Sequence, residues 1–334
     1  HGYGEEALVS FEKMQRDGFS PDEVTSICVL KACGNNESIK NGKRIQSMIV
    51  TSFLLEKDSL LGNALMDMYI KSGFLGKAQE VLEYTYIRDV ISWNALINGY
   101  NGKGYFQDAI SCLNMMDHEI AVATSITFVG GLKACSGIHD FQKGQELHDK
   151  IIKAGFDEKL EVGNALVGMY CACGLILEAC NVFDGLSIRD VISWTILSSG
   201  YAEHGPFEEA LKCFDHMELC DVIHDATTFV STLKACANLG NIDKGHEMHQ
   251  KIKQKGFEKN LFVGSTLVDM YAKCASLIEA EKAFKELISH DVMSWNALVA
   301  GYAEHGISHS VIIQCLGEML AEGINPNGVT YACF

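Results

Sequence analysis

The stretch RDVISWNALINGY, residues 88–100, occurs in three versions in this chain of 334 residues. It returns as RDVISWTILSSGY at 189–201 and as HDVMSWNALVAGY at 290–302. Trp93, Trp194 and Trp295 in these phrases are the only tryptophans of the chain, and both intervals between them are 101 residues long. Self-similarity at a fixed period is typical of a repeat protein, although 101 residues is too long for one structural unit.

Two further phrases divide each interval into three related units. VGNALVGMY at 162–170 is similar to 61–69 and 263–271, and ITFVGGLKAC at 126–135 is similar to 24–33 and 227–236. Aligning these phrases gives units of 35, 35 and 31 residues. The predicted complete units are 23–58, 59–89, 90–124, 125–159, 160–190, 191–225, 226–260, 261–291 and 292–327, with partial units at 1–22 and 328–334.

Each unit contains two stretches with helical periodicity. Trp93, Leu96, Ile97 and Tyr100 are spaced as i, i+3, i+4 and i+7, and a second stripe follows the helix breaker NGKG at 101–104. That second stripe consists of Phe106, Ala109, Ile110, Leu113 and Met116. Because a helix hairpin cannot bury its apolar faces alone, we expect an all-α fold, an α-solenoid of helix-turn-helix repeats coiled into a superhelix with a concave inner surface.

The composition limits the classes of function that this chain can have. Hydrophobic residues make up 48% of the chain and only 3 residues are Pro, which is typical of a folded, helix-rich protein. The chain has no apolar run of about 18 residues, the length needed to span a bilayer, so we expect no membrane contact. A net charge of −16 has the wrong sign for a nucleic-acid-binding protein, unless the positive charge is confined to a groove.

The 13 cysteines form no C-x-x-C pair. Cys33, Cys135 and Cys236 each close the phrase K-A-C, and Cys173 recurs as Cys274. This placement favours buried small hydrophobic residues in a reducing compartment over a disulfide framework or a zinc site.

Several helical repeats have periods of 34–47 residues, among them the tetratricopeptide, armadillo and HEAT repeats. The tetratricopeptide pattern requires a Leu-Gly pair after its tryptophan, and W-N-A-L-I-N-G-Y lacks this pair. Over almost the whole chain the phrases instead resemble the plant pentatricopeptide repeat family, PLS subclass, in which P, L and S units alternate. The resemblance implies an α-solenoid that binds single-stranded RNA with one nucleotide per repeat. Most members of this subclass specify sites of C-to-U editing in organellar transcripts.

In that family the fifth and the last residue of a unit together select the base. The resemblance therefore implies six base-contacting pairs, because the L units have Ile27, Val129 and Val230 at the fifth position and receive no preference. The pairs are Asn63 with Asp89 (U), Asn94 with Thr124 (a pyrimidine, Y), Asn164 with Asp190 (U), Thr195 with Asp225 (G), Ser265 with Asp291 (G) and Asn296 with Asn327 (C). With n for an L unit, the implied RNA is 5′-U-Y-n-U-G-n-G-C-3′.

The second residue of each P and S unit sandwiches the base in the family. These residues are Leu60, Ile91, Ile192, Phe262 and Met293. Glu161 departs from this pattern in one S unit. The alternative for the apolar residues is ordinary core between repeats, and the alternative for the polar fifth residues is solvation. The polar residue recurs at one slot of all six complete P and S units, which favours RNA contact.

Catalytic signals are weak. HMELC at 216–220 contains H-x-E without the P-C-x-x-C of a zinc deaminase, and HEMH at 246–249 lacks the H-E-x-x-H spacing of a zinc protease. We therefore expect no catalysis, metal or cofactor in this chain. The resemblance implies single-stranded organellar RNA as the partner, with an editing deaminase or editing cofactors in trans, in a mitochondrion or chloroplast. A protein-interaction scaffold and a truncated product without function are the alternatives.

Overall fold

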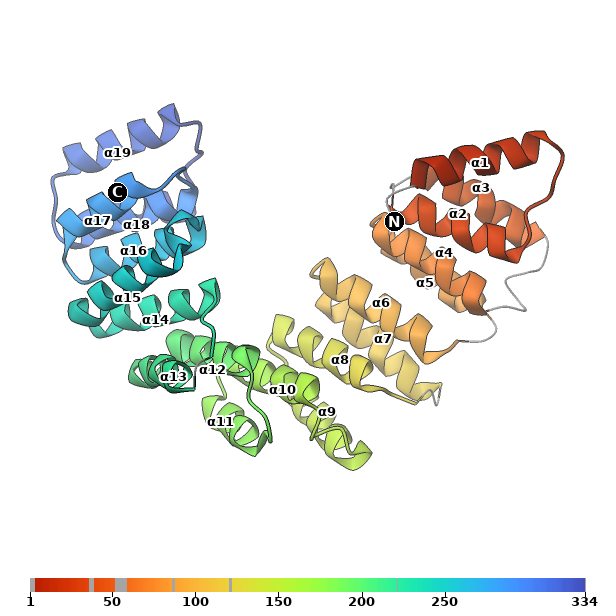
Figure 1. Cartoon of the computed structure of the whole chain (residues 1–334), viewed down its shortest axis with the longest axis horizontal. Coiled ribbons are helices and arrows are strands. Elements are labelled where there is room, and N and C mark those ends of the chain that lie inside the picture. The colour runs from red at the N-terminus through yellow and green to blue at the C-terminus, as the bar shows by residue number, and fades with distance from the viewer. Residues whose placement is uncertain are drawn as a thin grey trace. The chain divides into compact units, whose positions relative to one another are not determined.

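The computed structural model describes residues 4–35, 39–51, 59–85, 88–119, 122–220 and 222–333. It divides into two compact units, His1–Met169 and Tyr170–Phe334, with the division inside helix α10. Figure 1 colours the first from red to yellow-green and the second from green to blue. The predicted unit boundary at residue 58 and the outermost residues of both partial units lie outside the described residues.

The described residues form helices joined by short connections, and no strand occurs among them. The all-α prediction is confirmed. The first unit contains α1 (Gly4–Arg16), α2 (Glu23–Asn35), α3 (Ile39–Thr51), α4 (Ser59–Lys71), α5 (Leu75–Tyr84), α6 (Val90–Gly102), α7 (Phe106–His118), α8 (Ser125–Ile138), α9 (Phe141–Ala154) and the first part of α10 (Leu160–Ala172).

The second unit continues the same alternation of helices. It contains α11 (Ile176–Gly185), α12 (Val191–His204), α13 (Phe207–Leu219), α14 (Ala226–Leu239), α15 (Ile242–Lys255), a 3-10 turn (Phe257–Lys259), α16 (Leu261–Lys273), α17 (Leu277–Glu286), α18 (Val292–Glu304), α19 (His309–Ala321) and α20 (Gly328–Ala332).

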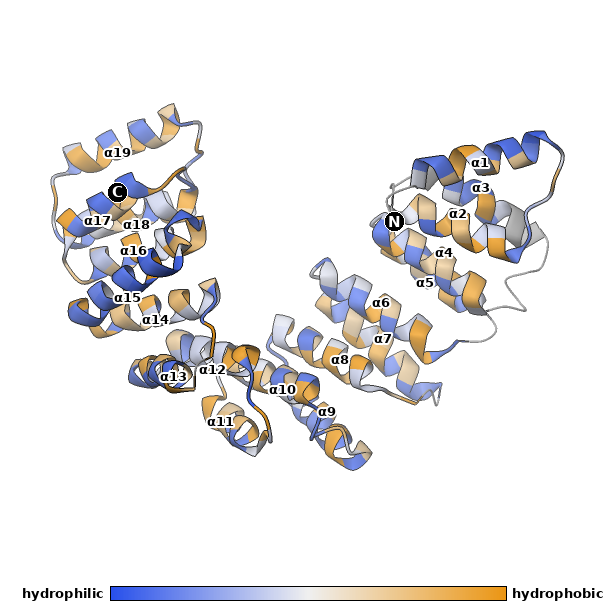
Figure 2. Ribbon diagram, in the orientation of Figure 1, coloured by the Kyte–Doolittle hydropathy of each residue, from blue (hydrophilic) through white to orange (hydrophobic). Residues whose placement is uncertain are grey.

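Within each of the two compact units, the helices form two layers of a solenoid. Helix α4 packs against α6, and α14 packs against α16. Helices α4 and α14 also contact the odd-numbered helices that precede and follow them. The even-numbered helices are therefore buried on several sides, whereas an odd-numbered helix such as α7 buries one stripe, as its separate hydrophobic and hydrophilic residues in Figure 2 indicate.

The predicted apolar stripes form the core. Trp93, Leu96, Ile97 and Tyr100 are all buried, and so are the residues from Ala109 to Met116 in the second stripe. Trp194 differs because it is only partly buried; its ring lies edge-on to Phe183, with the centroids 4.8 Å apart. None of the 13 cysteines forms a disulfide bond, and Cys33, Cys135 and Cys236 of the K-A-C phrase are completely buried. Burial raises the pKa of the Cys236 thiol to about 12.

No helix among the described residues is long and apolar enough to cross a membrane.

Candidate nucleic-acid interface

The last residue of every predicted P and S unit is the N-cap of the next even-numbered helix. An Asp, Thr or Asn is favoured there because its side chain can accept a hydrogen bond from a backbone N–H that has no partner within the helix. The Asp89 carboxylate accepts from the Ser92 amide at 2.8 Å, and Asp225 accepts from the Thr228 amide at 2.8 Å. The six caps are Asp89 on α6, Thr124 on α8, Asp190 on α12, Asp225 on α14, Asp291 on α18 and Asn327 on α20.

The polar residue three positions after the cap completes this arrangement. The Ser193 hydroxyl accepts from the Asp190 amide at 3.2 Å, and the Ser294 hydroxyl accepts from the Asp291 amide at 2.9 Å. No role was predicted for these residues from the sequence, although the repeated D-x-x-S and D-x-x-T spacing is typical of a capping box.

The polar fifth residues lie beside these caps. In four of the predicted base-contacting pairs, the two residues belong to the same compact unit and lie within hydrogen-bonding distance of each other. The amide nitrogen or hydroxyl of the fifth residue reaches the cap side chain in Asn63–Asp89 (3.4 Å to Oδ2), Asn94–Thr124 (3.2 Å), Ser265–Asp291 (3.3 Å) and Asn296–Asn327 (3.2 Å).

Thr195 and Asp225 are connected through a third residue. The hydroxyls of Thr195 and Thr228 lie 3.1 Å apart, and the Thr228 hydroxyl donates to Asp225 at 2.8 Å. The remaining predicted pair has its members in different compact units: Asn164 is buried in the first, and Asp190 caps α12 in the second.

The fifth residues are more buried than a freely projecting side chain would be. Asn63 is half-buried, and the other five expose between 3% and 9% of their surface: Asn94, Asn164, Thr195, Ser265 and Asn296. Each of these five side chains therefore exposes at most an edge of its polar group to a ligand. The Asn94 amide oxygen is buried and has no hydrogen-bond partner among the described residues, which leaves an acceptor unused.

The second residues stand exposed on the same helix face as the fifth, since residues three apart on a helix are neighbours. The sandwiching candidates Leu60, Ile91, Ile192, Phe262 and Met293 expose 63, 62, 57, 46 and 57% of their surface. The alternative that they form core between repeats does not fit this exposure. Glu161 is also exposed. The candidate interface is thus a polar row beside an apolar row.

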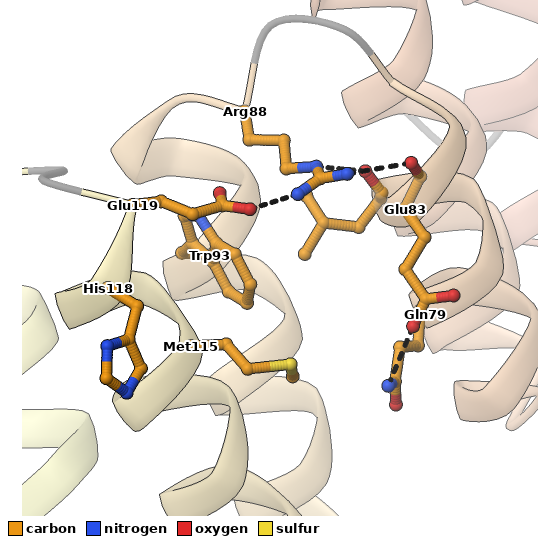
Figure 3. A pocket seen from close by; sticks show the side chains of 8 residues that line it. Gln79, Glu83, Arg88, Trp93, Met115, His118 and Glu119 are labelled. Carbon is orange, nitrogen blue, oxygen red and sulfur yellow. Dashed lines mark hydrogen bonds and ion pairs between the residues drawn. The ribbon is translucent and has the colours of Figure 1, made fainter.

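In the predicted S units, the residue before the cap contacts the end of the preceding odd-numbered helix. Arg88 donates from Nε to the Leu82 carbonyl at 3.0 Å and pairs with Glu119, as Figure 3 shows. Arg189 donates in the same way to the Phe183 carbonyl at 3.0 Å. The cavity beside Arg88 measures about 200 Å³ and lies among α5, α6 and α7. The buried indole N–H of Trp93, on its wall, has no acceptor among the described residues.

The histidines of the two weak catalytic phrases make structural contacts. The His216 ring stacks on Trp194 with the centroids 5.8 Å apart, and His249 Nδ1 lies 2.8 Å from the Tyr271 hydroxyl. Burial lowers the pKa of His249. In the described part of the chain, no group of three or more His, Cys, Asp or Glu side chains is arranged to hold a metal ion.

Comparison with known proteins identifies relatives over nearly the full chain. A chloroplastic pentatricopeptide repeat-containing protein of Arabidopsis thaliana is 33% identical over 331 residues, which are 99% of this chain and 53% of the relative. A mitochondrial one of the same plant is 31% identical over 98% of this chain and 31% of its own length. The chain therefore spans about half the length, or less, of these relatives.

Among solved structures, the pentatricopeptide repeat protein PPR10 in complex with an 18-nt psaJ RNA element has a similar fold. The TM-score is 0.81 at 22% sequence identity, over 99% of this chain and 50% of that one. The PPR repeat model matches residues 63–84, 91–119, 164–189, 192–222, 227–257 and 265–292, together half of the chain. These matches and the helix pairs described above show that the chain belongs to the pentatricopeptide repeat family.

Proposed function

We propose that this chain binds single-stranded RNA along the even-numbered helices, with one nucleotide per repeat. The observation that carries the proposal is the recurring pair of a polar fifth residue and a polar helix cap, flanked by an exposed apolar second residue. An exposed apolar side chain can pack against the face of a base, while the polar edge beside it can hydrogen-bond the Watson–Crick edge. The RNA complex of PPR10, which has a similar fold, supports RNA binding by a solenoid of this kind.

The unit lengths favour the PLS subclass and the unit boundaries given above. We propose the recognition sequence 5′-U-Y-n-U-G-n-G-C-3′, with the P and S units selecting bases and the L units selecting none. Asn63 and Asn164 would each select U, since an amide group both donates and accepts hydrogen bonds. Thr195 and Ser265 would select G, and Asn296 would select C.

In the cell we propose that the chain addresses an organellar transcript for C-to-U editing or other processing. The base-recognition surface would supply the address, and a deaminase or an editing cofactor in trans would supply the chemistry. The names of the relatives, chloroplastic in one case and mitochondrial in another, support an organelle as the place of action.

The test is a change of base preference by one substitution. The wild-type chain should bind the proposed RNA more tightly than an RNA in which both U positions carry purines. Thr195→Asn gives its unit the Asn–Asp combination of the U-selecting units. The preference at the fifth nucleotide should move from G to U by about five- to ten-fold, the discrimination expected of one hydrogen bond. Fluorescence anisotropy with labelled oligonucleotides measures both comparisons.

The control is Ser111→Asn on the exposed side of α7, which changes a hydroxyl to an amide away from the proposed RNA face. This variant should keep the wild-type preference for G. Equal affinity of the wild type for the proposed and the purine-substituted RNA would contradict the base assignment. Absence of binding to either RNA would favour a protein-interaction scaffold.

A further inference from the structure

The predicted L units lack a polar fifth residue. Ile27 and Val129 are partly buried and Val230 is 3% exposed, so none of them can hydrogen-bond a base. Yet each L unit contributes a full even-numbered helix, α2, α8 or α14, to the same layer as the base-contacting helices. An RNA strand that follows this layer passes over them as well.

Each of these three helices carries a lysine on the face that also bears the second and fifth residues of the unit. Lys31, Lys133 and Lys234 open the K-A-C phrases, four residues after the apolar fifth residue and seven after the exposed second residue. Residues at i, i+3 and i+7 share one helix face, and seven residues correspond to about 10 Å along the axis. The lysine therefore stands two turns beyond the position where a base would stack.

Few acidic side chains pair with these lysines. Lys31 and Lys133 are exposed, and the described residues include no ion-pair partner for either. Lys234 lies 3.6 Å from Glu203, with 40% and 56% of the two side chains exposed, so this pair is weak and open to competition. No acidic residue occurs within four positions of any of the three lysines.

Each of these lysines is the ninth residue of its unit. The ninth residues of the P and S units do not carry an uncompensated positive charge. In two S units this position holds Asp67 or Asp269, each paired with a lysine one turn later: Lys71 at 2.8 Å and Lys273 at 2.9 Å. The S unit 160–190 has Gly168 at this position, and the P units have Asn98, Ser199 and Ala300, all without charge. A net positive charge at this position is thus confined to the L units.

We propose that Lys31, Lys133 and Lys234 bind phosphate groups of the RNA, so that the L units hold the backbone while the P and S units select bases. This inference rests on the proposed function. An ammonium group is a point charge without base preference, which suits a unit that has no polar fifth residue. The arrangement also explains how a chain of net charge −16 can bind a polyanion, because the cations needed lie on the binding face.

The test compares two triple variants of the full chain. The first is K31Q/K133Q/K234Q. The matched control is K43Q/K153Q/K255Q, which removes three exposed lysines from the second helices of the same units, α3, α9 and α15. The RNA is the proposed sequence with one added 5′ nucleotide, so that it reaches the unit of Lys31. Affinity for this RNA and for its purine-substituted version is measured at several salt concentrations.

Each phosphate contact to a single strand contributes about −0.7 to the slope of log affinity against log salt concentration. Loss of three contacts should make the slope less negative by about 2 and weaken binding about 100-fold at 0.1 M salt. The preference for the proposed RNA over the purine-substituted one should remain, and the control variant should keep the wild-type slope.

The outcomes separate the two proposals. A wild-type chain that binds the proposed RNA selectively, together with equal salt slopes for the two triple variants, overturns the phosphate assignment and leaves the proposed function standing. A wild-type chain that binds neither RNA overturns both. A triple variant that loses base preference along with affinity also contradicts the assignment, because a phosphate contact carries no base information.

Discussion

At the scale of single residues, the phrase R-D-V-I-S-W concentrates three structural tasks. Arg88 closes the end of α5, Asp89 caps the start of α6, and Ser92 lies beside the Asp89 carboxylate. The cap is at the same time the proposed second determinant of base choice. A change of base preference at this position is therefore compatible with the helix start when the new residue is Asp, Asn, Thr or Ser.

Asp225 allows the two tasks to be separated by substitution. Asp225→Ala removes the acceptor for the Thr228 amide and should lower the free energy of unfolding by about 1 kcal/mol, the usual effect of losing an N-cap. Asp225→Asn retains an acceptor and should unfold within a few tenths of a kcal/mol of the wild type. Urea denaturation followed by circular dichroism measures both.

The RNA side of the same pair of variants tests the dual role. Asp225→Asn should lose the preference for G at its nucleotide, because the carboxylate is replaced by an amide that also donates. If this stable variant retains the preference for G, Asp225 is a cap alone.

At the scale of helices, the sequence predicted the core well because burial leaves a periodic trace. Leu96 recurs as a leucine in every version of the phrase and is buried in α6. The degree of burial at the fifth position was not predictable in this way. Asn94 is polar and adjacent to Trp93, and it is only 8% exposed where it contacts Thr124, the cap of α8, a contact that alignment of units does not reveal.

The turns of the predicted S units contain an exception that only the backbone geometry shows. Gly73 and Gly174 have φ angles of 79° and 73°, and the corresponding residue of the third S unit is Ala275 with φ 59°. A side chain in this left-handed conformation costs about 1–2 kcal/mol, whereas glycine adopts it without strain.

Ala275→Gly should therefore raise the free energy of unfolding by about 0.5–1 kcal/mol, after allowance for the greater freedom of glycine in the unfolded chain. Thermal and urea denaturation provide the measurement. Ala300→Gly, the same substitution within helix α18, is the matched control and should destabilise by about 1 kcal/mol. A loss of stability in both variants would show that the turn is not strained.

At the scale of the whole molecule, the repeats make stability a local property. Packing contacts join helices that are close in sequence, and within the second unit one buried cluster extends from Phe214 on α13 to Met319 on α19. In such a quasi-one-dimensional architecture each repeat depends on its own core and on its immediate neighbours. Damage to one repeat should therefore spread only a short distance along the chain.

Phe229→Ala tests this expectation. Phe229 is completely buried on α14, and its ring lies 5.8 Å from Phe214 and 5.5 Å from Phe257, measured between centroids. Removing it should cost about 3–5 kcal/mol, which is the typical effect of truncating a buried phenylalanine. Hydrogen exchange followed by mass spectrometry should show a large loss of protection in α13–α16. Peptides from α4–α6 should exchange as in the wild type, because local opening there does not require the core around Phe229. A uniform loss of protection along the whole chain would instead mean that the solenoid unfolds as one cooperative body.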